Sequence, residues 1–421
     1  MAAVATAVDE PSSLRLLVAT WNVGCTAPPD SLSDWLHAGR GSHLVAVCLQ
    51  EVQSLEAPLS YLSCSRLSPL AQRWDESVGA ALEGMERVAV RQLVGMLLLV
   101  YAASPLAPLL QVRTRAAGTG PLGAGNKGAV AATLLLRGSS LTFLCCHLAA
   151  GKKGPQRRNA EHHELIERMR LGVQGTDDSM GVVPAGASGR QLLFWCGDLN
   201  YRLTLANEEA RKLAATGDVR GLLAADELRL CRERGEAFQG FEEAAIGFAP
   251  TYKYDLDSDS FDSSKKRRAP AYCDRILWRA EPNIVCESYV METGMRSSDH
   301  RAVSAVLNVE LLPFEPALQP SFRDDSEGGL LSSLLSVCAR CDHSVPHSTR
   351  LHAIFYLLTS TYRRDANPRV SRTHSYVVAS PPCRCLPCIR PSSASYTLLG
   401  TAPPSLRNSF TSKYGDPSIV R

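Results

Sequence analysis

The sequence lacks an excess of charge of either sign. Its 421 residues contain 45 lysines and arginines against 42 aspartates and glutamates, which leaves a formal net charge of +3. Proteins that bind polyanions along a broad surface are usually strongly basic, so this balance argues against a general nucleic-acid-binding protein. Any attraction to phosphate groups must therefore come from local clusters of cations.

The sequence also lacks a secretory signal and an unbroken membrane-spanning run. Residues 1–13 have neither a basic start nor a long apolar block. Residues 93–112 are uncharged and approach spanning length, but Pro105 and Pro108 interrupt them. We therefore expect a buried strand followed by a turn there.

The absence of a secretory signal indicates the redox state of the 14 cysteines. Several, such as Cys48 and Cys196, lie in apolar runs, where cysteine behaves as a small buried hydrophobic residue. We expect reduced thiols and a cytoplasmic protein, with peripheral contact at the cytosolic face of membranes. Apolar loops such as Leu55–Leu59 and Pro105–Leu110 are candidates for that contact if they lie near the mouth of a site.

Apolar runs alternate with polar connectors from Leu14 to about Leu312. Many of these runs are apolar on consecutive residues, which suits strands in sheets that are covered on both faces. The predicted strands are Leu14–Trp21, Leu44–Leu49, Leu97–Tyr101, Ala129–Leu136, Leu141–His147, Leu192–Gly197, Arg275–Trp278 and Ala302–Val309. The predicted helices are Gly154–Leu171, Asn207–Ala215 and Val219–Gly235. This alternation predicts an α/β layered domain.

The composition changes after Pro313 and becomes richer in serine, proline, arginine and cysteine. We predict an N-terminal extension at 1–13, one catalytic domain at 14–313 and a mostly disordered tail at 314–421. The pair Cys338 and Cys341 invites a zinc interpretation, although the spacing of the tail cysteines and histidines does not match a regular finger. Palmitoylation is a second alternative, and an unstructured tail that binds protein partners is the favoured one.

The most specific pattern is Gly197-Asp198-Leu199-Asn200, which directly follows a predicted strand. Residues two apart on a strand point to the same face, so Asp198 and Asn200 can address one substrate. Asp198 is suited to orient an attacking water molecule, and Asn200 is suited to donate to a phosphate oxygen.

Two earlier strand ends carry ligands suited to a hard cation. Asn22 and Glu51 each follow an apolar run. Mg²⁺ is held in proteins by one or two carboxylates together with water and phosphate oxygens, and Glu51 fits that role. Each residue taken alone is more often a strand-end hydrogen-bonding group.

Three further residues are candidates for acid–base chemistry. His147 ends another predicted strand, and a lone histidine there is more often structural. Asp274 can accept a hydrogen bond from His300 and stabilise its imidazolium form, as carboxylates do in catalytic triads. Asp299, beside that histidine, is suited to support the metal or the nucleophile.

Taken together, the motifs resemble the inositol polyphosphate 5-phosphatases, a branch of the DNase I-like phosphohydrolases. They occur in the order of that family and cover about residues 14–310. They are Thr20–Val23, Leu49–Val52, Gly125–Gly128, His147–Ala150, Gly197–Arg202, Pro250–Asp255, Cys273–Trp278 and Ser298–His300. Gly24, Cys25, Gln53 and Tyr272 depart from the family pattern, but none of these changes removes a proposed catalytic group.

The resemblance implies a four-layer sandwich of two mixed β-sheets flanked by helices. It implies Mg²⁺-dependent removal of the 5-phosphate from phosphoinositides, such as phosphatidylinositol 4,5-bisphosphate, or from soluble inositol polyphosphates. The match also implies roles for the site residues. Glu51 and Asn22 hold the metal, His147 and Asn200 contact the scissile phosphate, Asp198 activates water, and Asp274 and His300 act at the phosphorus. Tyr252, Lys266 and Arg268 hold the 4-phosphate, and Asn126 and Lys127 face a remaining ring phosphate.

Two alternatives to this interpretation remain open. A DNase I-like nuclease would share the scaffold and the metal chemistry, but it should present a longer basic or aromatic surface than this charge balance suggests. The second alternative is a scaffold that works through its tail while the catalytic domain is idle.

Overall fold

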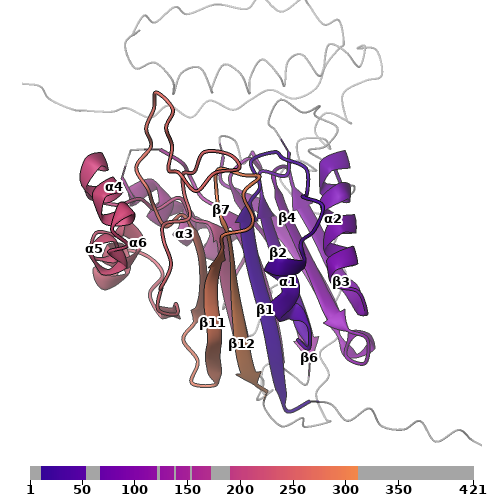
Figure 1. Cartoon of the computed structure of the whole chain (residues 1–421). Helices are drawn as coiled ribbons and strands as arrows, with labels where there is room; N and C mark the ends of the chain where they lie inside the picture. Colours follow the sequence, from indigo (N-terminus) through magenta and orange to yellow (C-terminus); the bar gives the residue numbers. More distant parts are fainter. Residues whose placement is uncertain are drawn as a thin grey trace, which may run out of the picture. The chain divides into compact units, whose positions relative to one another are not determined.

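Two six-stranded sheets form the framework of the computed structural model, which describes residues 11–53, 67–120, 124–136, 139–151, 154–171 and 190–311. The first sheet has the order β11 (Ile284–Glu292), β12 (Ala302–Glu310), β1 (Ser13–Asn22), β2 (Leu44–Gln50), β4 (Met96–Ala103) and β3 (Met85–Leu93). Its β1 and β2 are parallel and its other neighbours antiparallel. Figure 1 shows β1 beside β12, although these strands are far apart in the sequence.

The second sheet has the order β5 (Gln111–Gly118), β6 (Gly128–Leu136), β7 (Ser139–His147), β8 (Gln191–Asp198), β10 (Asp274–Arg279) and β9 (Phe241–Glu242). Here β7 and β8 are parallel and the other pairs antiparallel. Both sheets are therefore mixed, as the resemblance implied.

The main core lies between the two sheets. It is formed by alternate residues of strands from both sheets, among them Val18, Cys48, Leu98, Phe143 and Phe194, all fully buried. Burying both faces of a strand explains why these segments read as continuous apolar runs. The thiol of Cys196 belongs to this core.

Helices cover the outer faces of the sheets and complete four layers (Figure 1). On the first sheet, Trp21 packs edge-to-face against Trp35 and Trp74, which belong to the helical segments on that side. The helices and 3₁₀ turns are α1 (Ser33–Leu36), η1 (His37–Gly39), α2 (Pro69–Ala81), η3 (Ala107–Leu109), α3 (Gln156–Arg168), α4 (Asn207–Ala215), α5 (Val219–Ala224) and α6 (Glu227–Glu233).

The single helix predicted at Val219–Gly235 is wrong, because two helices, α5 and α6, occupy this range. Asp226 separates them: its backbone is extended and bridges Leu203. Its side chain accepts a hydrogen bond from the backbone N–H of Arg229 at 3.0 Å. An aspartate in this position caps a new helix, so the apolar periodicity continues while the backbone does not.

All eight predicted strands are present, including the buried strand expected at 97–101, which is part of β4. In the described residues, none of the helices is long and apolar enough to cross a bilayer. The loop Pro105–Leu110 follows the end of β4 that pairs with the start of β2, Ala102 with Leu44. It therefore lies at the end of the sheet opposite Gln50, and it is not a site-mouth loop. The loop Leu55–Leu59 falls outside the described residues.

Candidate active site

Residues from both sheets meet where β1, β2, β7 and β8 end. Strand pairing places His147 opposite Asp198, and Asp198 opposite Asp274, so these three form one row across the second sheet. Asn22, at the end of β1 in the first sheet, donates from Nδ2 to Asp198 Oδ2 at 2.9 Å. The two sheets are thus joined at the carboxylate of Asp198.

Asp198 is the centre of this cluster and is 1% exposed. Besides Asn22, it accepts from the backbone N–H of Asn200 at 3.0 Å, and its Oδ2 lies 3.2 Å from His147 Nε2. Burial by itself would raise the pKa of this carboxyl, but His300, His147 and Lys127 outweigh it and hold the pKa well below its usual range. Asp198 is therefore an ionised acceptor suited to orient a water molecule.

The sequence argument placed Asp198 and Asn200 together by strand alternation, and the structure brings them together for a different reason. The strand β8 ends at Asp198, and Asn200 adopts a left-handed conformation with φ of 58°. The side chain of Asp198 closes this turn by accepting from the Asn200 backbone. Asparagine tolerates that conformation better than most residues, which suits the position.

Asp274 and His300 form a buried pair. Their Oδ2 and Nδ1 atoms lie 2.8 Å apart, and the hydroxyl of Thr251 donates to the same carboxylate oxygen at 2.6 Å. Burial by itself would lower the pKa of His300, but the charges of Asp274 and Asp198 and the hydrogen bond outweigh it and raise the pKa to about 9. At neutral pH this side chain is an imidazolium, with Nε2 3.9 Å from Asp198 Oδ2.

The titration of His300 can be measured directly. Because its pKa in the folded protein lies above the ordinary value of about 6.5, its contribution to stability is full below about pH 6.5 and is lost as the pH rises through about 9. Replacing Asp274 with asparagine is expected to lower the pKa of His300 by about 1–3 units. Imidazole NMR signals followed from pH 5 to 10 would check this, and an unchanged midpoint would contradict it.

A second group surrounds His147. Lys127, which comes from the loop between β5 and β6, contacts its Nε2 atom, and Glu51 Oε1 lies 3.8 Å from the same atom. Burial and then the charge of Lys127 lower the pKa of His147, which favours its neutral form. The Gly125–Gly128 motif thus belongs to the connection between the paired strands β5 and β6, and it brings Lys127 to His147. Among the described residues, no group forms a hydrogen bond with the buried Oδ1 of the neighbouring Asn126.

Glu51 and Asn22 fit a divalent metal by the chemistry of their donors. The side chain of Glu51 is 44% exposed, so its carboxylate can reach an ion at the surface of the site. Asn22 Oδ1, which accepts from the backbone N–H of Gly24 at 3.1 Å, is a second hard oxygen. Asp198, Asp274 and His300 also have potential ligand atoms within 4.8 Å of one another. An imidazolium has no lone pair for a metal, however, so the first pair is the better candidate.

The residues expected to read the neighbouring phosphate come from two segments of the chain. The ring of Tyr252 lies 4.7 Å from that of His300. Lys266 and Arg268 lie instead on a loop. In the described chain neither of them forms an ion pair or side-chain hydrogen bond with the Asp198 cluster. Asp299, expected to support the metal or the nucleophile, contacts the amine of Lys253.

Sequence reasoning missed two arginines that hold these groups. Arg211 of α4 donates to the backbone oxygens of Asp262 and Arg268, at 2.7 and 3.0 Å, and so shapes the loop that carries the cations. Arg202 contacts both Asn200 and Tyr252. The spacing 198, 200, 202 was a signal for the second arginine, but nothing in the sequence pointed to the first.

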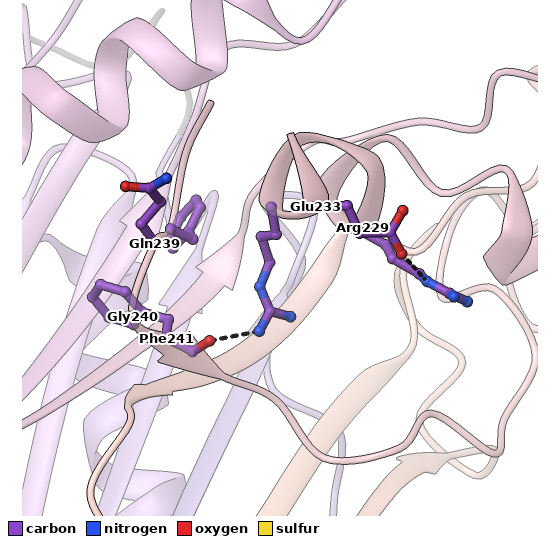
Figure 2. A pocket seen from close by; sticks show the side chains of 7 residues that line it. Arg229, Glu233, Gln239, Gly240 and Phe241 are labelled. Carbon is purple, nitrogen blue, oxygen red and sulfur yellow. Dashed lines mark hydrogen bonds and ion pairs between the residues drawn. The ribbon is translucent and has the colours of Figure 1, made fainter. Parts of the chain in front are cut away.

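An open pocket of about 540 Å³ lies elsewhere, beside α6 and β9. Figure 2 shows its lining, in which Arg229 pairs with Glu233 and Arg232 donates to the backbone oxygen of Phe241. None of the predicted site residues lines it. The chemistry of the cluster at Asp198 is therefore separate from this pocket.

Comparison with known proteins identifies the family. Endonuclease/Exonuclease/phosphatase family 2 matches residues 19–306. Synaptojanin of Caenorhabditis elegans is 33% identical over 72% of this chain, but the chain spans only 28% of that protein's length. Type I inositol polyphosphate 5-phosphatase 8 of Arabidopsis thaliana is 30% identical, with 73% of each chain covered.

A solved structure supports the same assignment. The inositol polyphosphate 5-phosphatase domain of SPsynaptojanin, in complex with inositol (1,4)-bisphosphate and a calcium ion, superposes with a TM-score of 0.60 and 28% identity. The match covers 70% of this chain and 84% of that one. Fold, motif order and sequence identity agree, and the chain belongs to the inositol polyphosphate 5-phosphatase family within Endonuclease/Exonuclease/phosphatase family 2.

Proposed function

We propose that this chain is a Mg²⁺-dependent phosphatase that removes the 5-phosphate from phosphoinositides, such as phosphatidylinositol 4,5-bisphosphate, or from soluble inositol polyphosphates. The observation that carries the proposal is the buried pairing of an ionised carboxylate, Asp198, with an imidazolium, His300, whose nearest atoms are 3.9 Å apart. One group can accept a proton from water, and the other can stabilise negative charge on a phosphoryl group. Hydrolysis of a phosphate ester needs both.

The reaction follows from the positions of these groups. Asp198 aims a water molecule at phosphorus and accepts its proton. His300, held by Asp274, stabilises charge on the phosphoryl oxygens, and Asn200 donates to one of them. A magnesium ion held by Glu51 and Asn22 would neutralise phosphate charge and stabilise the leaving oxygen. Catalysis of this kind depends mainly on positioning and electrostatics.

The relatives support the substrate class. The SPsynaptojanin domain was solved with inositol (1,4)-bisphosphate, an inositol ring that carries no 5-phosphate and retains its 4-phosphate. Such a molecule corresponds to what is left after a 5-phosphate is removed. In this chain, the loop with Lys266 and Arg268 offers cations for a neighbouring ring phosphate.

The proposed catalytic domain is residues 14–313, which agrees with a first strand that begins at Ser13 and a last strand that ends at Glu310. A cytoplasmic setting fits the free thiols of the described cysteines. Peripheral contact with a membrane would follow from a lipid substrate. The tail, with its proposed protein partners and its zinc or palmitoylation alternatives, lies outside the described residues.

A phosphate-release panel tests the proposal. The purified full chain is given vesicles that contain phosphatidylinositol 4,5-bisphosphate, soluble inositol 1,4,5-trisphosphate, and supercoiled plasmid DNA, each with magnesium or with a chelator. We expect magnesium-dependent phosphate release from at least one inositol substrate and an intact plasmid. Nicking of the plasmid without phosphate release would favour the nuclease alternative, and no reaction in any arm would favour the scaffold.

Substrate recognition by the cationic loop gives a separate prediction. Replacing Lys266 or Arg268 with alanine is expected to raise KM about tenfold for substrates with a 4-phosphate, because each loses one charge-assisted hydrogen bond. Substrates without that phosphate should be unaffected. Arg267→Ala is the matched control, since this exposed arginine pairs with Glu208 at 3.2 Å. Equal effects on both substrate classes would count against the assignment.

A further inference from the structure

We infer that Arg202 is a positioning residue that fixes the orientation of the Asn200 amide and braces Tyr252 against His300. The inference rests on the proposed function, because it concerns how the site presents a donor to the phosphoryl group. Arg202 itself is not placed at the phosphorus. It acts through the two side chains that it holds.

The first observation is a two-point contact with one residue. Arg202 Nε donates to the backbone oxygen of Asn200 at 3.1 Å, and Arg202 Nη2 donates to its Oδ1 at 2.5 Å. A guanidinium has only donors, so the amide atom that faces it must be the oxygen. The two ends of an asparagine amide have nearly the same shape, so the hydrogen-bond partners determine its orientation. Arg202 therefore fixes the orientation in which the amide nitrogen of Asn200, and not its oxygen, is available to the phosphoryl group.

The opposite end of the amide is the donor that the reaction needs. Asn200 Nδ2 donates one hydrogen to the backbone oxygen of Leu148 at 3.1 Å. Among the described residues Nδ2 has no second acceptor, so its other hydrogen is the candidate donor to a phosphoryl oxygen. Asn200 is 3% exposed, so water cannot easily compensate a flipped amide. A flip would also turn the oxygen toward the carbonyl of Leu148 and toward a negatively charged substrate.

The second observation connects the same cation to the substrate-reading side. The guanidinium carbon of Arg202 lies 4.3 Å from the centre of the Tyr252 ring, and that ring lies 4.7 Å from the ring of His300. A cation over an aromatic face is attractive, especially in a partly desolvated site. Arg202 thus holds together a phosphoryl donor and a residue predicted to read the neighbouring phosphate.

Lysine cannot replace this arrangement. The planar guanidinium presents its N–H groups in a rigid fork and stacks on a ring at the same time, whereas an ammonium is a compact point charge on a flexible stem. Arg202→Lys should therefore keep the charge and lose the orientation. Comparing Arg202→Lys with the uncharged Arg202→Met separates the two contributions.

Kinetics provide the first test. Arg202→Met is expected to lower kcat about 100-fold, the scale of a group misplaced by roughly 1 Å. Arg202→Lys should recover no more than a small part of that loss. In the double variant Asn200→Ala with Arg202→Met, the loss in kcat should be clearly smaller than the product of the two single losses, because the part that Arg202 exerts through Asn200 is already gone. Additive losses would overturn the inference.

A readout that does not depend on turnover keeps this inference distinct from the proposed function. In the full chain labelled with ¹⁵N at asparagine, Asn200 should give one pair of side-chain NH₂ signals, assigned by its loss in Asn200→Ala. Arg202→Met should broaden, shift or double that pair. An unchanged pair would overturn the inference even if the wild-type chain released no phosphate, which would itself contradict only the proposed function.

The control is Arg229→Met, which removes an exposed arginine whose partner is Glu233 at 2.9 Å. This variant should leave kcat, KM and the NH₂ signals unchanged. Thermal unfolding of every variant checks that the fold is intact.

Discussion

Replacing Asp198 with asparagine is expected to lower kcat by about 1,000-fold or more, since the group that accepts the proton of water is lost. The asparagine oxygen can still accept from Asn22, which donates to this position at 2.9 Å. The fold should therefore survive the change. His300→Ala should cost a similar factor, because it removes the cation that stabilises the phosphoryl charge.

The measurement is initial-rate kinetics of phosphate release, with circular dichroism and thermal unfolding as checks on the fold. Asp218→Asn is the matched control. Asp218 caps α5 by accepting from the backbone N–H of Gly221 at 2.9 Å, and asparagine caps helices equally well. Near-normal turnover in Asp198→Asn or His300→Ala would refute the assignment of these residues.

Replacing Arg275 with methionine is expected to lower the free energy of unfolding by about 3–5 kcal/mol, the cost of breaking a buried ion pair. Its guanidinium is 2% exposed and lies 2.8 Å from Asp226 and 2.7 Å from Glu243. The variant would leave Asp226 buried without a counter-charge, and it would leave Glu243 with Arg232 at 3.6 Å as its remaining cation. Arg275 directly follows Asp274, so this network also anchors the start of β10 at the site.

Urea denaturation of the full chain measures this effect as a shift in midpoint at constant slope. Neutralising the partners by Asp226→Asn and Glu243→Gln in the Arg275→Met background should recover part of the stability, because the cost comes from unpaired charge. Arg229→Met removes one member of an exposed pair and should change stability by less than about 0.5 kcal/mol. A loss no larger than this in Arg275→Met would contradict the prediction.

The strands predicted from the sequence lie in the interior of the two sheets, whereas the missed strands lie at the sheet edges. Segments such as β2 and β6 are buried along their whole length, and their continuous apolar runs are visible in the sequence. The missed strands, β3, β5, β9 and β11, are the four sheet edges. Edge strands are partly exposed and carry polar residues, so their sequences resemble those of loops. Val285 of β11, for example, is 61% exposed.

The candidate site shows the same division. The sequence pointed to the ends of apolar runs, and Asn22, His147 and Asp198 do converge. Lys266 and Arg268 could be recognised as cations in the sequence, but the attachment of their loop to α4 through Arg211 could not be predicted. That contact joins segments about fifty residues apart through backbone carbonyls, which carry no sequence signal.

The sequence by itself determined the fold family, the chemical types of the site residues and the strands that carry them. These follow from local apolar patterns and from motifs whose order is fixed along the chain. Only the tertiary structure decided how far the pKa of His300 is raised, the left-handed turn at Asn200 and the contacts of Arg202 with Asn200. Those properties depend on burial and on the relative placement of groups from different strands, and both arise only when the two sheets pack together.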